Sequence, residues 1–262
     1  MIEGNPYLAH PNRIRGIQEV PAAVFRLKTS FEQRITSTAE TAQSFLDNAV
    51  LACVDTGFFT ENADVSKIKR KVGSGFNTSV YLFQVDEQPW VAKIGAKKAP
   101  VPGWFDPSSK EYAQWYANNL TIVRNKFKDK LPYLIPSPQF VTHQNNSEGE
   151  QTSVIIQPFI GEAYPVNRMS SKSEEYRVAI LEELKAFYDG FEELYVEHNF
   201  IPDLGTKGNL VVQPVGDDYH LTLLDNGMID FNAVSPVLNT WSMFRYRTRP
   251  KGYMTKLARS IK

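Results

Sequence analysis

Residues 72–94 read VGSGFNTSVYLFQVDEQPWVAKI, and this stretch decides the fold class that the sequence predicts. Apolar and β-branched residues are concentrated in 80–85 and 90–94, and the turn sequence DEQP separates the two runs. Such runs between turn residues predict strands. A further short strand is expected at Val72, before the glycines at 73–75. The stretch therefore predicts three consecutive strands.

Helical patterns alternate with further strand patterns outside this stretch. Capping residues and apolar positions three and four apart predict three helices: one from Ser37 to about Gly57, one opening at Ser108, and one from Ser173 to about Asn199. Apolar runs predict strands at 139–143 and 153–157, and a hairpin of 210–213 with 220–224. Strands dominate one half and helices the other, which is typical of an α+β fold with two lobes.

The charge of the chain is balanced, with 29 basic and 29 acidic residues. No strong overall field therefore attracts nucleic acid or lipid. The exception is the segment from Arg245 to Lys262, which has seven basic residues and no acidic one. This basic tail could meet an acidic partner or a phosphate, or it could be a solvated basic end.

Cysteine and apolar content exclude several classes of protein. The single cysteine, Cys53, cannot form an internal disulfide, lies in an apolar run and indicates a small buried side chain. No Cys/His cluster suggests zinc. The N-terminus lacks the apolar core of a signal peptide, and no stretch approaches the roughly 20 apolar residues that span a bilayer. We expect a cytoplasmic protein that does not enter a membrane.

The first candidate for ligand chemistry is the glycine segment Gly73-Ser74-Gly75 between two expected strands. Glycine lets the backbone approach phosphate oxygens closely, because no Cβ intervenes. A plain hairpin turn would have the same composition.

Lys93 interrupts an apolar strand, and a lysine buried there would need an anion nearby. Phosphates or a carboxylate such as Glu111 would serve. Two simpler interpretations stay open: an alternating strand with Lys93 on its solvent face, and a capping box formed by Ser108 and Glu111 that needs no lysine.

The segment from Asp203 to Asn209 joins an expected helix to an expected strand, a position where loops often carry function. Asp203 could orient or deprotonate a hydroxyl, Lys207 could neutralise a transferring phosphate, and Asn209 could ligate a cation. A glycine-rich connection with polar residues is the alternative.

Asp225 ends an apolar run and is followed by Asn226-Gly227. A carboxylate suits magnesium, which prefers oxygen ligands. Asn-Gly is also the strongest two-residue hairpin signal, so a simple hairpin is an alternative. Asp230 is a second carboxylate that could be the ligand instead.

Taken in order, these motifs resemble those of the protein-kinase-like superfamily, over roughly residues 66–235. They are Gly-x-Gly, Val-Ala-Lys, a helical Glu, an apolar strand ending in Gln157-Pro158-Phe159, Asp…Asn, and Leu-Leu-Asp-Asn-Gly. The size and short C-terminal end are closer to small-molecule kinases of the aminoglycoside phosphotransferase type than to true protein kinases. The resemblance implies a bilobal kinase-like fold with a reduced C-terminal lobe and an extra N-terminal helical segment. The implied parts are 1–65, a β-rich nucleotide-binding lobe at 66–157, and a helical lobe at 158–262.

The resemblance also implies how ATP would bind. Gly73, Ser74 and Gly75 would cover its phosphates, and Lys93, paired with Glu111, would contact the α- and β-phosphates. The backbone of Gln157 to Phe159 would meet adenine, with Ile156 behind it.

For the reaction, the resemblance implies Asp203 as the catalytic base, with Lys207 beside the transferring phosphate. Asn209 and Asp225 would hold Mg²⁺, and Gly227 would complete an Asp-x-Gly motif. The sequence departs from the family in two ways: Ile201-Pro202 precede Asp203 where His or Tyr is usual, and Asn209 lies six positions after Asp203 instead of five.

Three functions follow from these motifs. The leading hypothesis is an ATP-dependent phosphotransferase that moves the γ-phosphoryl group to a hydroxyl, with a small-molecule acceptor favoured over a protein. The altered loop after Ile201-Pro202 motivates the second, a pseudokinase or nucleotide-binding interaction module. The third is an adenylyltransferase on the same fold.

Overall fold

The computed structural model describes residues 39–74, 78–95, 110–202, 204, 208–224, 228–230 and 236–261, with the backbone alone at 39, 167, 170, 200, 228–230 and 236–247. Contacts divide the chain into two units, Met1–Thr36 and Ser37–Lys262, and every element below belongs to the second. The two boundaries that the sequence predicts between parts of the chain, after residues 65 and 157, both lie inside that second unit. Its mixture of helices and antiparallel sheets confirms the α+β class.

A five-stranded antiparallel sheet follows from the strand patterns in the first part of the chain. Its strands are β1 (Arg70–Ser74), β2 (Thr78–Val85), β3 (Gln88–Gly95), β4 (Phe140–Asn145) and β5 (Gln151–Pro158). Their order is β1-β2-β3-β5-β4. All five had been predicted from apolar runs between turn residues, and the structure confirms them.

The two faces of this sheet are distinguished by its register. Tyr81 of β2 pairs with Ala92 of β3, which pairs with Ile156 of β5, so these three side chains share a face. Helix α2 (Ala39–Asp55) packs on that face, as its buried residues join the same hydrophobic cluster. Lys93 is one residue along from Ala92 and therefore belongs to the opposite face.

Helix α2, predicted from its capping box, is also attached to the tip of the β4–β5 hairpin. The Asn48 side chain donates to the Asn145 carbonyl (2.6 Å), and the Ser147 amide donates to the Ser44 hydroxyl (2.9 Å). Two polar residues one turn apart on α2 thus fix the hairpin tip, while the apolar stripe of the same helix covers the sheet.

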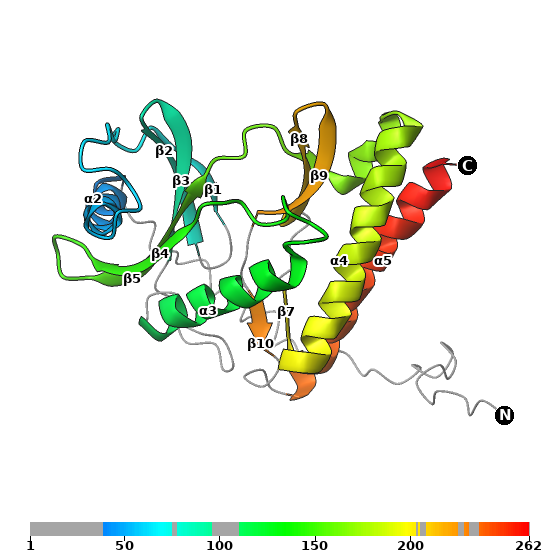
Figure 1. Cartoon of the computed structure of the whole chain (residues 1–262). Helices are drawn as coiled ribbons and strands as arrows, with labels where there is room; N and C mark the ends of the chain where they lie inside the picture. The colour runs from blue at the N-terminus through cyan, green and yellow to red at the C-terminus, as the bar shows by residue number, and fades with distance from the viewer. Residues whose placement is uncertain are drawn as a thin grey trace, which may run out of the picture. The chain divides into compact units, whose positions relative to one another are not determined.

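Three long helices contribute to a second hydrophobic core. They are α3 (Lys110–Phe127), α4 (Glu174–His198) and α5 (Pro236–Ile261), with the short 3₁₀ helix η2 (Val166–Ser171) beside them. The structure confirms α3 and α4, and Figure 1 shows α4 and α5 side by side. Within the described residues, no helix has the length and hydropathy needed to cross a bilayer.

Helix α5 was not predicted, and it contains most of the basic tail. Pro250 lies inside the helix, although proline removes a backbone donor and crowds the preceding turn. Leu257 is buried in the second core, and Lys251 lies over the Tyr188 ring of α4 at 4.8 Å from its centroid. The apolar side of this part of the tail is therefore packed, while Lys251, Lys256 and Arg259 are exposed, as a solvated basic end would have them.

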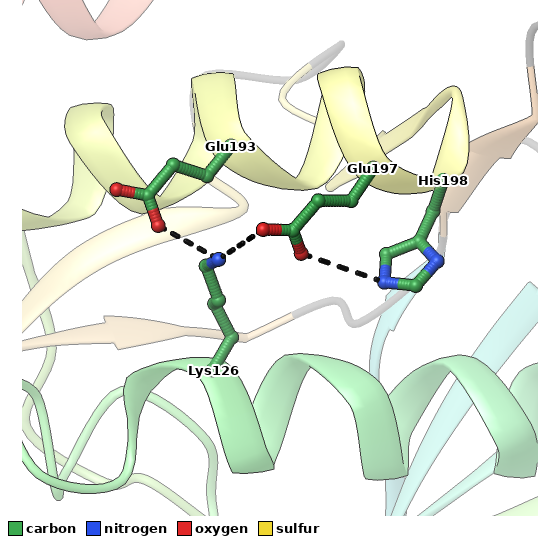
Figure 2. A network of polar contacts seen from close by, with 4 residues as sticks. All are labelled: Lys126, Glu193, Glu197 and His198. Carbon is green, nitrogen blue, oxygen red and sulfur yellow. Dashed lines mark hydrogen bonds and ion pairs between the residues drawn. The ribbon is translucent and has the colours of Figure 1, made fainter.

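Helices α3 and α4 approach each other closely where they cross. A Cβ added to Gly190 would lie 2.4 Å from Cε1 of Phe127, so only glycine fits there. Beside this crossing, Lys126 contacts both Glu193 (2.7 Å) and Glu197 (3.0 Å), as Figure 2 shows. A steric fit and an ion-pair network thus join the same two helices.

A second, three-stranded sheet has the order β6-β8-β9. Its strands are β6 (Tyr164–Pro165), β8 (Leu210–Val215) and β9 (Asp218–Leu223). The predicted hairpin is confirmed, with Gly216 at a positive φ of 63° in the turn.

The edge of β9 is covered by polar contacts from two other segments. Its Leu221 amide donates to Glu183 of α4 (2.6 Å), and its Leu223 amide donates to the Leu134 carbonyl (2.7 Å). The Thr222 hydroxyl between them donates to the Tyr133 carbonyl (3.1 Å). The segment after α3 therefore runs along this strand.

Two short strands overturn the simple hairpin interpretation of Asn226-Gly227. β10 (Met228–Asp230) pairs antiparallel with β7 (Phe200–Pro202), whereas β9 pairs with β8. The strands on the two sides of Asn226-Gly227 therefore belong to different sheets. This arrangement brings the chain after Asp225 back to the strand that immediately precedes Asp203.

Candidate functional site

The glycine segment begins in the last residues of β1. Gly73 pairs with Val80 and Ser74 with Ser79 of β2, after an irregularity in the register that follows Lys71. A Cβ added to Gly73 would meet only Val80, at 3.8 Å, which is an ordinary contact. Packing therefore does not require glycine here, and close approach of a ligand is a remaining reason for it. Gly75 lies outside the described residues.

Lys93 lies in the middle of β3 with only 6% of its surface exposed. This burial rules out the interpretation of an alternating strand with the lysine on its solvent face. The Lys93 ammonium donates to the carbonyl of Leu224, 131 positions further along the chain. The lysine is thus buried on the sheet face opposite α2, and it contacts the residue directly before Asp225.

Leu224 is the point at which three predicted motifs meet. Its carbonyl accepts from Lys93, and its amide donates to the carbonyl of Asn209 (2.7 Å). Asn209 is itself buried. Two of the predicted site residues, Lys93 and Asn209, are therefore joined through one residue, and the next residue in the chain is a third, Asp225.

The end of β5 supplies a second part of the candidate site. Gln157 pairs with Val91, two residues before Lys93, so Gln157 and Lys93 belong to the same face of the sheet. Gln157 is 2% exposed, and its side-chain oxygen has no hydrogen-bond partner among the described residues. An unsatisfied buried amide is costly and suits a polar group of a ligand.

The backbone at this end of β5 offers few donors. Pro158 has no N–H, and the Phe159 amide already donates to the Pro89 carbonyl (3.0 Å). An adenine bound here as predicted would therefore find no free backbone donor at Pro158 or Phe159. Ile156 lies on the other face, among the buried residues under α2.

Glu111 is in the first turn of α3, and its side chain is exposed. Ala113, Tyr116 and Leu120 mark the buried stripe of this helix. At about 100° per residue, Glu111 is on the far side of the helix from that stripe. Its pairing with Lys93 stays a prediction, and it would require α3 to move or rotate.

The residues predicted to carry the reaction flank described segments. Asp203, Lys207 and Asp225 lie outside the described residues. The neighbours of Asp203 in the sequence, Pro202 and Leu204, are both buried. Within the described part of the chain, no three His, Cys, Asp or Glu side chains gather as a metal site.

No family model matches the chain, and no curated protein matches its sequence. The residues of the site therefore have to be judged on their chemistry alone.

Two contacts near these residues were not predicted from the sequence. One is the bond to the Leu224 carbonyl, a backbone group that the leucine side chain gives no means of predicting. Arg249 of α5 donates to the Leu204 carbonyl, but the proline at 250 obscured the helix that carries it. What is assembled is a buried ammonium, an unsatisfied buried amide and the backbone that leads into Asp225. Such a set could bind an anionic, polar ligand.

Proposed function

We propose that this protein is an ATP-dependent phosphotransferase that moves the γ-phosphoryl group of ATP to a hydroxyl, with the help of Mg²⁺. The acceptor we favour is a small molecule. The observation that carries the proposal is the buried Lys93, which is hydrogen-bonded to the residue before Asp225.

Support comes first from the cost of burying an ammonium. Lys93 lies inside a sheet, where a charged group is unfavourable unless anions or dipoles compensate it. The Leu224 carbonyl supplies one dipole and fixes the ammonium at the end of β9. A protein that needed only a stable sheet would gain more from an apolar side chain at this position. A phosphate-binding role would account for a charged residue at this position.

Support comes second from the order of the elements. In protein kinases the phosphate-binding lysine is on the third strand, and magnesium is held by an Asp after the last hairpin and by an Asn of the catalytic loop. Lys93 is on β3, Asp225 follows the β8–β9 hairpin, and Asn209 precedes β8. The Leu224 amide, bonded to Asn209, brings the last two positions together.

The proposed chemistry uses these residues for positioning and charge. Transfer of a phosphoryl group needs an in-line arrangement and neutralisation of charge more than covalent catalysis. Lys93 would neutralise phosphate charge, and Asp203 would orient or deprotonate the acceptor hydroxyl. Asn209 and Asp225 have the oxygen donors that Mg²⁺ prefers, and Mg²⁺ would neutralise charge on the phosphates.

Nucleotide binding and turnover by purified protein test the proposal. We expect Mg-ATP to bind in isothermal titration calorimetry and to be converted slowly to ADP, with faster conversion when hydroxyl compounds are added. Lys93→Met should weaken binding about tenfold or more, as the loss of a charged contact costs roughly 1.5–3 kcal/mol. Absence of any Mg-ATP binding by folded wild-type protein would contradict the proposal.

A nucleotide-binding module without transfer is the second candidate, and the exposed position of Glu111 favours it. In active protein kinases the lysine and the helix glutamate must be paired. Mg-ATP binding with no nucleotide product, over a broad panel of hydroxyl compounds, would favour this second function. The products also test adenylyl transfer, which would release pyrophosphate in place of ADP.

A further inference from the structure

One residue of the basic tail contacts the loop that carries the proposed catalytic base. The Arg249 guanidinium, on α5, donates to the carbonyl of Leu204. Leu204 directly follows Asp203 in the sequence. We refer to residues 203–209 as the Asp203 loop. The contact joins this loop to a helix that begins 27 residues after its last residue.

The described parts of the Asp203 loop have three attachments. At its start, Pro202 ends β7, which pairs with β10. At its end, the Asn209 carbonyl accepts from Leu224, which also accepts from Lys93. Between them, Leu204 is 1% exposed and its carbonyl accepts from Arg249. Strand pairing and the hairpin supply the outer attachments, and α5 supplies the middle one.

The chemistry of arginine makes this middle attachment a strong one. A guanidinium is always charged and keeps its donors in a rigid plane, so its bond to a carbonyl is stronger than a neutral one. Its charge also acts on Tyr253, one turn along α5. Burial raises the pKa of Tyr253, and the positive charge of Arg249 opposes that rise. The positive charge of Arg249 thus lies near Tyr253 on its own helix, and its guanidinium donates a hydrogen bond to Leu204.

The helix that carries Arg249 is itself fixed to the core. Leu257 is buried between the elements of the second core, which also contains Leu204. Near the end of α5, Arg177 of α4 donates to the Ser260 carbonyl. Among the described residues, two arginine-to-carbonyl bonds therefore involve α5, and the one from Arg249 reaches the Asp203 loop.

We propose that Arg249 is a positioning residue, through which α5 fixes the backbone at Leu204, the residue next to the proposed catalytic base. The inference rests on the proposed function and goes beyond it, since it gives the basic tail a role inside the molecule. Arg249 acts on the loop backbone and needs no contact with ATP or with the acceptor. Its loss should therefore change turnover and leave nucleotide affinity nearly as it was.

The test compares Arg249→Met and Arg249→Lys with Arg177→Met in the full chain. Circular dichroism first shows whether each variant is folded. If Arg249→Met does not fold, Arg249→Lys is used as the test variant. We expect both Arg249 variants to lower the kcat of ADP formation from Mg-ATP by about tenfold to a hundredfold, because small misplacements of catalytic groups have effects of that size. Their KM for ATP should stay within about twofold.

Hydrogen–deuterium exchange provides a readout that does not depend on activity. Peptides that cover 203–209 should exchange faster in the Arg249 variants than in wild type. In Arg177→Met, both the exchange of these peptides and the kcat should equal those of wild type. Unchanged loop exchange in the Arg249 variants, or an equal loss of kcat in Arg177→Met, would overturn the inference. If wild-type protein shows no turnover, the proposed function fails, and loop exchange alone then decides whether Arg249 holds the loop.

Discussion

Cys53 is a buried thiol under the five-stranded sheet, in the core that α2 forms with β2, β3 and β5. Burial raises its pKa to about 12, because a thiolate would lose its hydration there. Only the thiolate reacts readily with disulfide reagents. Since the chain contains no other cysteine, its thiol chemistry reports on this one place.

We predict that the native protein does not react with a chromogenic disulfide reagent at pH 8, while the denatured protein releases one equivalent of chromophore. The folded pKa lies above the unfolded one, so the stability linked to this group is complete below about pH 8.5 and is lost as the pH rises through 12. Cys53→Ala should remove that part of the alkaline destabilisation. Rapid reaction of native protein at pH 8 would contradict the buried position.

Lys93 shows what a sequence does and does not determine at the scale of one residue. Its place on a strand was predictable from apolar residues on both sides. The sequence did not predict whether the face that carries Lys93 is buried, because Ala92 and Ile94 fit a strand buried on one side or on both. That depends on distant parts of the chain, because α3 contacts β4 and β5 and the Leu224 carbonyl accepts from the lysine. The lysine contacts the backbone carbonyl of Leu224, and the residue type at 224 could not indicate this contact because every residue has such a carbonyl.

The crossing of α3 and α4 belongs to the scale of elements, and Gly190 is its closest point. We predict that Gly190→Ala destabilises the protein, since the new Cβ would meet the buried Phe127 ring at 2.4 Å. Overpacking costs about 1–3 kcal/mol, and the better helix propensity of alanine returns about 1 kcal/mol. Denaturant unfolding measures the net loss.

Gly252 is the matched control, because it is a helical glycine with nothing within 4 Å of its would-be Cβ. Gly252→Ala should raise stability by up to about 1 kcal/mol. The same gain in Gly190→Ala would show that the helices separate without cost. The sequence around Gly190 does not show this steric role, because its partner Phe127 lies 63 positions away.

The ion-pair network beside this crossing gives a prediction about pH. Lys126, hydrogen-bonded to Glu193, lowers the pKa of that carboxyl, and Glu193 and Glu197 together raise the pKa of Lys126. A lowered carboxyl pKa contributes stability above its unfolded value, and this contribution is lost as the pH falls through the folded value. We therefore expect Lys126→Met to lower Tm at pH 7 and to match wild type near pH 3.

Salt provides the control for this network, whose two carboxylates are about half exposed. At 1 M NaCl, screening should shrink the difference between Lys126→Met and wild type at pH 7. A difference that persists at pH 3 and in high salt would assign the effect to the packing of the lysine stem instead.

The elements themselves were largely predictable. The five strands of the first sheet, helices α2, α3 and α4, and the β8–β9 hairpin all follow from local periodicity and turn residues. The strands β6, β7 and β10 have two or three residues, too few for a period to show. Helix α5 was missed because Pro250 argues against a helix, and its packing on α4 overrides that local preference.

At the scale of the whole molecule, the C-terminal helix is part of a common core. Leu257 is buried together with residues of α3, α4 and the second sheet. We predict that Leu257→Ala costs about 2–5 kcal/mol, the range for truncation of a buried leucine. Leu51, 61% exposed on α2, is the control, and Leu51→Ala should change stability by less than about 0.5 kcal/mol. Chemical denaturation measures both, and an equally small effect at Leu257 would separate α5 from the core.

The covered edge of β9 has a consequence for how the protein behaves at high concentration. An open strand edge is a template on which another chain can add a strand, and such pairing leads to fibrils. Here a glutamate of α4 and the backbone after α3 already take the Leu221 and Leu223 amides. Loss of Glu183 would leave the Leu221 amide without this acceptor. The carboxylate that joins a helix to a strand thus also occupies a donor with which a second chain could otherwise pair.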